Sequence, residues 1–239
     1  MRAAVVIPAY NAAQHVRALI ERVACAVPGE FSHWVVVDDG STDSTVAEIR
    51  ALVTRFPALE LVRRPQNGGY GAAMKDGLAT AVGRGAELVA CIHADGQYSP
   101  ERLPSLVEAL RARGLDLLQG SRIASGTALS GGMPLYKYVA NAGLNFLENR
   151  VLGLGLTDYH SGYLVYGPRA LCLPFRELSN SFDFDLELIA MAGARGLSVG
   201  EAPIPTHYGD EVSHLRPIDY GLRVLSVLWK YSRGRYNAA

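Results

Sequence analysis

Residues 35–41 read Val-Val-Val-Asp-Asp-Gly-Ser, and this stretch determines the fold that we expect. Its β-branched apolar residues predict a strand over Trp34–Val37 that is buried on both faces of a sheet. Two carboxylates and a turn end this strand, and a segment with helical periodicity follows from about Ser44 to Arg55. A buried strand that ends in polar residues and leads into a helix is typical of a parallel βα unit.

The same unit recurs on both sides of this stretch. Strands are expected at Ala3–Ile7, Leu59–Arg63 and Leu88–Ile92, and helices at Ala12–Cys25, Tyr70–Val82 and about Glu101–Arg113. This alternation predicts an α/β fold, a doubly wound and mostly parallel sheet with helices on both faces, whose ligands gather at the carboxyl ends of the strands. We expect one domain over 1–239, with a nucleotide-binding half at 1–115, an acceptor half at 116–215, and a C-terminal amphipathic helix and tail at 216–239.

Composition narrows the function classes. The 239 residues carry 23 basic and 23 acidic side chains, so the net charge is zero and nucleic-acid binding is not expected. With 49% hydrophobic residues the chain has a sizeable core. Cys25, Cys91 and Cys172 form no CxxC pair, which indicates core-filling thiols in a reducing cytoplasm. No signal peptide and no uncharged stretch of about 20 apolar residues is recognised, so we expect a cytoplasmic protein that at most lies on a membrane surface.

Asp38 and Asp39 are the first candidate ligand contacts. Their carboxylates can accept hydrogen bonds from a base and from ribose hydroxyls, as an acid does in dinucleotide-binding folds. The alternative is turn and helix-capping chemistry, in which Ser41, Asp43 or Ser44 satisfies the free amides of the following helix. Capping explains one acid and the glycine, but it does not explain two consecutive carboxylates at the end of an apolar strand.

Two further segments carry candidate polar contacts. Residues 67–71, Asn-Gly-Gly-Tyr-Gly, open a helix without the spacing of a dinucleotide or P-loop motif, so Gly69 and Lys75 either contact a phosphate or serve only a turn and the solvent. His93, Asp95 and Gln97 alternate after a strand and can converge on one point, where they suit an octahedral divalent ion. The alternative for this segment is a strand-terminating turn at Asp95.

Five ordered motifs resemble glycosyltransferase family 2, and within it most the polyprenyl-phosphate (dolichol-phosphate) mannosyl- and glucosyltransferases. They are residues 6–11 (Val-Ile-Pro-Ala-Tyr-Asn), 37–41 (Val-Asp-Asp-Gly-Ser), 94–97 (Ala-Asp-Gly-Gln), 120–122 (Gly-Ser-Arg) and 158–162 (Asp-Tyr-His-Ser-Gly). The resemblance covers about residues 3 to 215. It implies a GT-A fold, a nucleoside-diphosphate sugar of the GDP-mannose or UDP-glucose type, Mn²⁺ or Mg²⁺, and inversion at the anomeric carbon.

The resemblance also implies roles for individual residues. Asp158, Asp95 and Arg122 are expected at the reacting centre, with Asp158 as the base for a hydroxyl acceptor or as a positioning group for a phosphate acceptor. A nucleotide-sugar site is expected at Pro8, Tyr10, Asn11, Asp38, Asp39, Gly69, Lys75, Ala94 and Asp95. A metal site is expected at His93, Asp95 and Gln97, and an acceptor site at Lys137, His160, Ser161, Tyr208 and Ser213. His160 has simple packing as its alternative.

The chain departs from the family pattern at three positions. His93 stands where the family's D-x-D-x-Q segment begins with an acid, Ala12 stands where Glu often follows the first motif, and Tyr208 aligns with an Arg of lipid-phosphate members. The expected acceptor is a polyprenyl phosphate. The alternatives are a soluble hydroxyl acceptor and a catalytically impaired homologue that binds a nucleotide sugar.

The C-terminal segment is expected to contact a membrane surface. From Pro217 it has the spacing of a helix with an apolar stripe, and from residue 223 onward it carries four basic residues and no acid. These are the features of an interfacial helix attracted to anionic headgroups. The alternative is a terminal helix packed on the core, with basic residues that favour its last turn.

Overall fold

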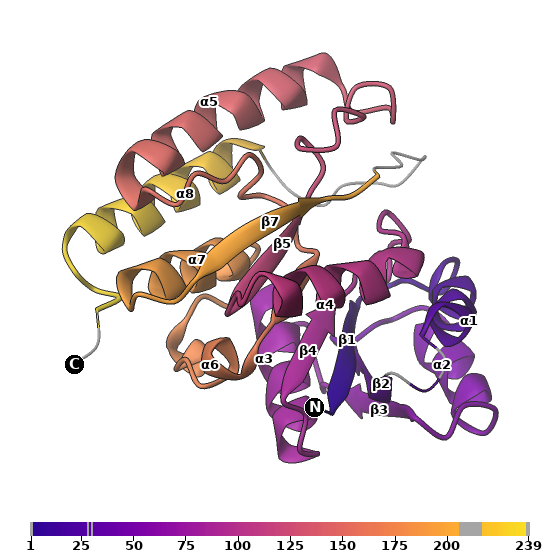
Figure 1. The fold of residues 1–239 in the computed structure, drawn as a ribbon. Helices are drawn as coiled ribbons and strands as arrows, with labels where there is room; N and C mark the ends of the chain where they lie inside the picture. The colour runs from indigo at the N-terminus through magenta and orange to yellow at the C-terminus, as the bar shows by residue number, and fades with distance from the viewer. Residues whose placement is uncertain (1, 28, 30, 206–216, 238–239) are drawn as a thin grey trace.

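A seven-stranded mixed sheet forms the centre of the molecule (Figure 1). The computed structural model describes residues 2–27, 29, 31–205 and 217–237. The strands are β1 (Ala3–Ala9), β2 (Phe31–Asp38), β3 (Leu59–Arg63), β4 (Leu88–Cys91), β5 (Leu117–Ser121), β6 (Leu164–Tyr166) and β7 (Val199–Pro203). Their order is β3-β2-β1-β4-β6-β5-β7, and β6 alone runs antiparallel to its neighbours.

Helices cover both faces of this sheet. They are α1 (Val16–Ala26), α2 (Thr45–Val53), α3 (Tyr70–Gly83), α4 (Leu103–Ala112), α5 (Leu135–Leu152), α6 (Pro168–Leu171), α7 (Phe184–Ala194) and α8 (Pro217–Ser232), with short 3₁₀ turns at Pro100–Arg102 and Phe175–Glu177. Figure 1 shows α5 and α8 side by side at one end of the molecule, far from α1 and α2, and the two helices pack against each other.

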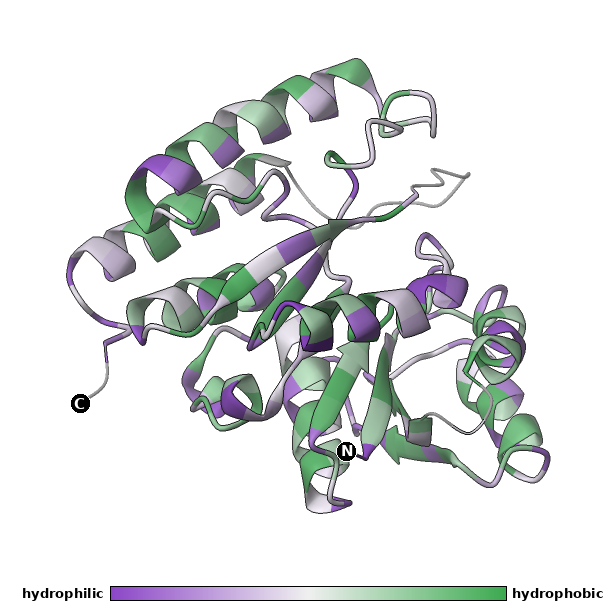
Figure 2. Cartoon of the chain, in the orientation of Figure 1, coloured by the Kyte–Doolittle hydropathy of each residue, from purple (hydrophilic) through white to green (hydrophobic). Residues whose placement is uncertain are grey.

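Strand alternation divides the core into two parts. Val5 and Ile7 of β1 pack with α1, α2 and α4, whereas Val6 packs with α3 and α7 on the opposite face. Because successive side chains of a strand point to opposite faces, a strand covered on both sides must be apolar throughout. All seven residues of β1 are buried, and Figure 2 shows the green colour of hydrophobic residues along β1 and β4. Gly77 permits the close approach of α3, since a Cβ there would lie 2.4 Å from Val6 Cγ1.

The strand order creates a crevice beside β1. From β1 the chain proceeds to β2 and β3 on one side, then returns to place β4 on the other side. The loops that follow β1 and β4 therefore diverge, and such a switch point is where open α/β sheets bind ligands. The polar segments that follow β1, β2 and β4 all reach this edge, because the three strands are parallel.

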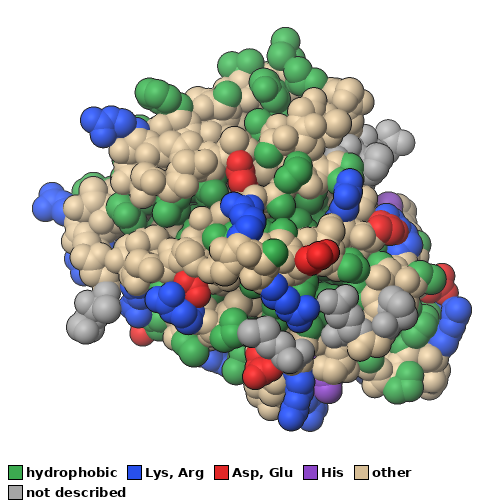
Figure 3. Space-filling view, in the orientation of Figure 1, with side chains coloured by type: hydrophobic (Ala, Val, Ile, Leu, Met, Phe, Trp, Pro, Cys, Tyr) green, Lys and Arg blue, Asp and Glu red, His purple; other side chains and the backbone are tan. Residues whose placement is uncertain are grey.

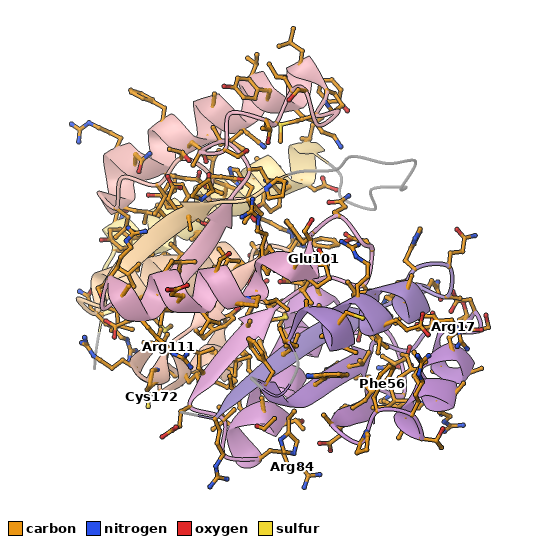
Figure 4. The ribbon with its side chains drawn as sticks, turned by 45° about the vertical axis from the view of Figure 1, so that its right-hand side comes forward. Arg17, Phe56, Arg84, Glu101, Arg111 and Cys172 are labelled. Carbon is orange, nitrogen blue, oxygen red and sulfur yellow. The ribbon has the colours of Figure 1, made fainter. Side chains whose placement is uncertain are left out.

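The predicted α/β class and the helices on both faces are confirmed. The four N-terminal strands and helices lie within a few residues of their expected positions, and the C-terminal helix spans Pro217–Ser232. The antiparallel strand β6 has only three residues, too few for periodicity to reveal its pairing. The expectation of core-filling cysteines holds for Cys91 but is wrong for Cys25 and Cys172, which are exposed; Figure 4 shows Cys172 at the edge of the molecule.

Candidate functional site

The loops after β1 and β2 interlock at the crevice. Asn11 adopts a left-handed conformation, with φ of 49°, and its Oδ1 accepts a hydrogen bond from Thr42 N at 2.9 Å. Its own N–H donates to Ser41 Oγ at 2.9 Å. Asp43 accepts hydrogen bonds from Thr45 N and Ala13 N, so it is Asp43 that supplies capping chemistry at the start of α2. Asn11 thus joins the two loops, and its side-chain oxygen is used within the protein.

Asp38 retains an acceptor that the protein does not use. It is the last residue of β2 and is fully buried. Oδ1 accepts a hydrogen bond from Ser41 N at 3.3 Å, while Oδ2 has no hydrogen-bond partner among the described residues. The nearest cation, Arg63 Nε, lies 3.9 Å from Oδ2. A buried carboxylate oxygen without a donor is costly, which favours an external donor at this position.

Both carboxylate oxygens of Asp39 accept hydrogen bonds from within the protein. Its two oxygens accept hydrogen bonds from the Gly68 and Gly69 amides at 3.0 and 2.9 Å, and Arg64 Nε lies 2.8 Å from Oδ1. Gly69 has φ of 96°, a conformation that favours glycine. Asp39 therefore shapes the glycine turn at the start of α3, whereas the adjacent Asp38 faces a different environment. The sequence motif does not distinguish the two carboxylates, but the structure does.

Three other expected nucleotide-site residues border the switch point. Pro8 and Ala94 are buried where β1 and β4 end, joined by a 3.4 Å bond from Ala94 N to Pro8 O. Tyr10, two residues after Pro8, is 41% exposed. The structure thus brings residues of the first and third motifs together, and the exposed Tyr10 ring belongs to the first of these motifs. Such a ring is suited to stacking on a planar base.

Lys75 holds a loop of the protein. Its Nζ donates to Leu178 O and, at 2.8 Å, to Asn180 Oδ1, and burial lowers the pKa of the amine. These bonds anchor the loop that precedes α7 against α3. The loop borders a polar cavity of about 460 Å³. Its lining residues are Asn67, Gly68, Gly69, Ser179, Asn180, Ser181 and Arg223.

His93 sits in an aromatic cage. Its Nε2 lies 3.1 Å from Tyr70 Oη, and the rings of Tyr70 and Tyr98 contact it edge-on, with centroids at 5.0 and 5.3 Å. Gly162 leaves room for the imidazole, since a Cβ there would come within 2.3 Å of Cε1 and Nε2. Burial lowers the pKa of His93, so the ring is held in its neutral form.

Asp95 and Gln97 form a turn after β4. Asp95 Oδ1 accepts a hydrogen bond from Gln97 N at 3.0 Å, and a second cavity of about 180 Å³ reaches Asp95 and Gly96. Within residues 2–27, 29, 31–205 and 217–237, no group of three or more His, Cys, Asp or Glu side chains is placed to hold a metal ion. A half-buried carboxylate at a switch point nevertheless fits a divalent ion that takes most of its ligands from a diphosphate.

Arg122 and Asp158 form a buried ion pair. Arg122 Nε and Nη2 donate to the two Asp158 oxygens at 2.7 and 2.9 Å, and Arg122 N adds a bond at 3.1 Å. His160 N donates a fourth at 3.2 Å. Burial acts to raise the pKa of Asp158, but the attraction and hydrogen bonds of Arg122 outweigh it and lower that pKa. Asp158 is therefore a stable anion that orients Arg122.

The expected acceptor residues are spread over several elements. His160 Nδ1 lies 2.9 Å from Tyr220 Oη of α8, and Nε2 lies 3.3 Å from Glu148 of α5. Ser161 is buried, and its carbonyl accepts a hydrogen bond from Gln119. Lys137 lies on α5 and is half-buried. Tyr208 and Ser213 lie outside the described residues.

Sequence reasoning missed the partners that α7, α8 and α5 supply. Asp183 makes no capping bond at the start of α7, and Asp185 is buried against Tyr70, whose hydroxyl donates to it at 2.7 Å. Glu148, fully buried on α5, lies 3.3 Å from His160 Nε2 but accepts no hydrogen bond of good geometry among the described residues. A charged residue inside an apolar helical stripe was the available signal for both Asp185 and Glu148.

Comparisons with known proteins identify a family and relatives of this chain. The family profile "Glycosyl transferase family 2" matches residues 4–171. The chain is 37% identical over 164 residues to a dodecaprenyl-phosphate galacturonate synthase of Rhizobium johnstonii, an alignment that covers 67% of this chain and 46% of that protein. It is 33% identical over 208 residues to a polyprenol monophosphomannose synthase of Mycolicibacterium smegmatis, which covers 85% and 76% of the two chains.

The fold is shared with a solved glycosyltransferase structure. Glucosyl-3-phosphoglycerate synthase from Mycobacterium tuberculosis, crystallised with Mn²⁺, UDP and phosphoglyceric acid, superposes with a TM-score of 0.72 at 20% identity. The superposition covers 96% of this chain and 78% of that one. At this identity the likeness establishes the architecture, which is that of the GT-A fold.

Proposed function

The chain belongs to glycosyltransferase family 2, and we propose that it moves a hexose from a nucleoside-diphosphate sugar to a polyprenyl phosphate. A phosphate oxygen of the acceptor forms a bond to the anomeric carbon as the bond from that carbon to the diphosphate breaks. The nucleoside diphosphate leaves, and the single displacement inverts the anomeric centre. The donor is of the GDP-mannose or UDP-glucose type.

The unsatisfied acceptor on Asp38 supports the nucleotide site. Its buried Oδ2 is placed to accept a hydrogen bond from a base or ribose, and Tyr10 offers an exposed ring just after the neighbouring strand β1. Asp39 and Asn11 hold the surrounding loops in place. Because the protein already holds these loops in place, ligand binding costs little of their conformational entropy.

Asp95 is the residue that we propose to hold a divalent ion, Mn²⁺ or Mg²⁺, with His93 and Gln97 beside it. When bound, the ion would stabilise the negative charge that develops on the leaving diphosphate. His93 Nε2 is engaged by Tyr70, so only Nδ1 of this ring is available as a ligand atom. The protein contributes few donors, as is usual where the substrate phosphates complete the coordination.

The Arg122–Asp158 pair is the single observation that carries the proposed chemistry. The buried guanidinium is fixed by two hydrogen bonds and needs no reorganisation when charge appears nearby. Asp158 accepts four hydrogen bonds and has a lowered pKa, which suits a positioning anion better than a base. A phosphate acceptor is already anionic and needs no base, so this geometry favours it over a hydroxyl acceptor.

The names of the relatives support a lipid phosphate as the acceptor. The proteins from Rhizobium johnstonii and Mycolicibacterium smegmatis are both named for transfer to a polyprenyl phosphate. The alignment with the first extends over less than half of that protein's length.

A donor and acceptor screen tests the proposal. UDP- and GDP-sugars are incubated with the protein, with Mn²⁺, Mg²⁺ or EDTA, and with polyprenyl phosphate, a soluble sugar or no acceptor. We expect metal-dependent formation of a lipid-linked sugar from one donor. Transfer only to the soluble sugar would contradict the lipid acceptor, and metal-dependent nucleotide binding without turnover would identify an impaired homologue.

We also propose that α5 and α8 place this site against an anionic membrane surface. Thirteen large hydrophobic side chains are exposed among the described residues, and eight of them lie on these two helices. They are Leu135, Tyr136, Val139, Phe146, Ile218, Leu222, Leu225 and Trp229. Figure 3 shows hydrophobic side chains gathered along the upper edge of the molecule, where Figure 1 places α5.

Charge supports a bilayer as the surface that these helices contact. Residues 135–152 and 217–237 carry six basic and two acidic residues, although the whole chain is neutral, and the Arg233 guanidinium lies over the Trp229 ring at 5.6 Å. An apolar stripe with aromatic and basic residues is typical of interfacial helices. Within the described part of the chain, no helix is long and apolar enough to span a bilayer.

A further inference from the structure

Tyr70 lies between His93 and Asp185, and its single hydroxyl proton links the three side chains. Tyr70 Oη is 2.7 Å from Asp185 Oδ2 and 3.1 Å from His93 Nε2. The Tyr70 ring is fixed by stacking on Phe182, with centroids 6.0 Å apart and planes at 11°. The three residues come from α3, α7 and the segment after β4, so the arrangement exists only in the folded chain.

The position of this proton follows from the hydrogen bonds that the buried Asp185 carboxylate accepts. Asp185 is buried, its Oδ1 has no hydrogen-bond partner among the described residues, and Tyr70 is the donor to its Oδ2. If Tyr70 donated to His93 instead, the buried carboxylate would lose that donor, which is a costly state. With Asp185 ionised, Tyr70 therefore donates to Asp185 and accepts from His93, and Nε2 of His93 must carry a proton.

We propose that Tyr70 and Asp185 are positioning residues that fix His93 as the Nε2–H tautomer and so keep a lone pair on Nδ1. With Nε2 protonated, Nδ1 is the ring atom through which His93 can bind a divalent ion or accept a hydrogen bond from a ligand. The tautomer is a property of the protein without ligands. Only the consequence for metal binding rests on the proposed function.

Replacement of Asp185 separates this proposal from a merely structural role. In Asp185→Leu the Tyr70 hydroxyl loses its carboxylate acceptor and turns to His93 Nε2, which forces the ring proton to Nδ1 and removes the lone pair there. In the double variant Asp185→Leu with Tyr70→Phe, no hydroxyl remains to donate, and the Nε2–H form returns. A second substitution that restores the lost property is not expected from damage to packing.

The first readout is the tautomer of His93 in ¹⁵N-labelled protein without metal or nucleotide. The His93 signals are assigned from the spectrum of His93→Gln. Burial raises the pKa of Asp185 to about 7, so spectra are recorded at pH 8.5, where the carboxylate is ionised. We expect Nε2–H in the native protein and in the double variant, and Nδ1–H in Asp185→Leu. Tyr98→Phe is the matched control, since it removes a hydroxyl that bonds Gly162 rather than His93.

The second readout is the affinity for Mn²⁺ in the presence of UDP, followed by the electron paramagnetic resonance of free Mn²⁺. We expect Asp185→Leu to weaken binding about 10- to 100-fold, as loss of a residue that orients a ligand does, and the double variant to recover part of it. An Nδ1–H tautomer in the native protein, or an unchanged tautomer in Asp185→Leu, would overturn the proposal. Where Asp185→Leu does not fold, Tyr70→Phe takes its place: the Nε2 proton then lacks its acceptor and should exchange with solvent faster than in the native protein, and an unchanged exchange rate would overturn the proposal. A native protein with the expected tautomer that binds no Mn²⁺ with UDP would refute the metal site alone.

Discussion

The guanidinium of Arg122 holds the carboxylate of Asp158 through two parallel hydrogen bonds, of 2.7 and 2.9 Å, at a position where Asp158 is fully buried. These residues are 36 positions apart in the sequence, one after β5 and one in the loop before β6. A planar fork of this kind is specific to arginine, because lysine presents a single point charge. The pair is therefore a structural link, and it fixes the orientation of the Arg122 guanidinium at the proposed reacting centre.

Arg122→Lys is expected to separate charge from geometry. The variant keeps a cation but loses the two-point grip, and we expect the turnover rate to fall about 10²-fold, as on removal of one electrostatic stabiliser. Urea denaturation should show a loss in the free energy of unfolding of about 1–3 kcal/mol, since hydrogen bonds to a buried charged group are lost while the charge is kept. Arg17→Lys is the control, because the Arg17–Glu48 pair lies at the surface, where Figure 4 shows Arg17. Equal effects of the two substitutions would contradict the assignment.

Asp38 and Asp39 should respond differently to the same substitution. Asp38→Asn removes the charge from the unpartnered oxygen, and we expect UDP or GDP to bind more weakly by about 1.5–3 kcal/mol, the contribution of a hydrogen bond to a charged group. Asp39→Asn loosens the glycine turn, so we expect it to lower the free energy of unfolding more than the affinity for the nucleotide. Calorimetric titration and thermal unfolding of both variants distinguish the two effects. Identical profiles for the two variants would show that both acids act in one way.

Asp95 is expected to be the least replaceable of the proposed metal residues. Asp95→Asn preserves the turn but removes the charge that opposes a dication, so the rate should fall about 10²-fold or more. Titration of Mn²⁺ in the presence of UDP should show a parallel loss of affinity. A variant that retains near-native turnover would rule out a metal at this position.

The buried Asp185 predicts a pH dependence of stability. Its folded pKa, about 7, lies above the unfolded value of 3.8, so the folded state binds this proton more tightly. The resulting stabilisation is complete below pH 3.8 and is lost as the pH rises to about 7, a change of about 4 kcal/mol at 1.36 kcal/mol per pKa unit. Asp185→Asn cannot titrate, so its free energy of unfolding should rise relative to that of the native protein as the pH increases over that range. The free energy of unfolding of both proteins, measured from pH 4 to pH 8, tests this expectation, and a constant difference would refute it.

The exposed stripes of α5 and α8 predict binding to anionic vesicles. We expect the double variant Phe146→Ser with Trp229→Ser to co-sediment much less with phosphatidylglycerol vesicles than the native protein, since two large apolar contacts are lost. Val53→Ser with Val82→Ser is the matched control, because these exposed residues lie on α2 and α3. Equal binding of the two double variants would exclude α5 and α8 as the contact surface.

The sequence by itself determined the architecture of the N-terminal half and the edge at which ligands gather. Short apolar strands alternate there with amphipathic helices, and this local periodicity is enough to predict parallel βα units. The sequence also places the motifs at 6–11, 37–41 and 94–97 at the ends of predicted strands. Because parallel strands end at the same edge of a sheet, the three motifs were expected there together. The apolar stripe of α8 was likewise visible as a repeat along one helix.

Only the tertiary structure decided what each polar residue does. Asp38 and Asp39 are adjacent in sequence, yet among the described residues Asp38 Oδ2 accepts no hydrogen bond, whereas Asp39 binds two amides that lie about 30 residues away. Tyr70 contacts Asp185 across 115 residues, and α5 lies beside α8 although residues 153–216 separate them in the sequence. Burial and hydrogen-bond partners depend on such contacts between distant segments, and local periodicity contains no information about them.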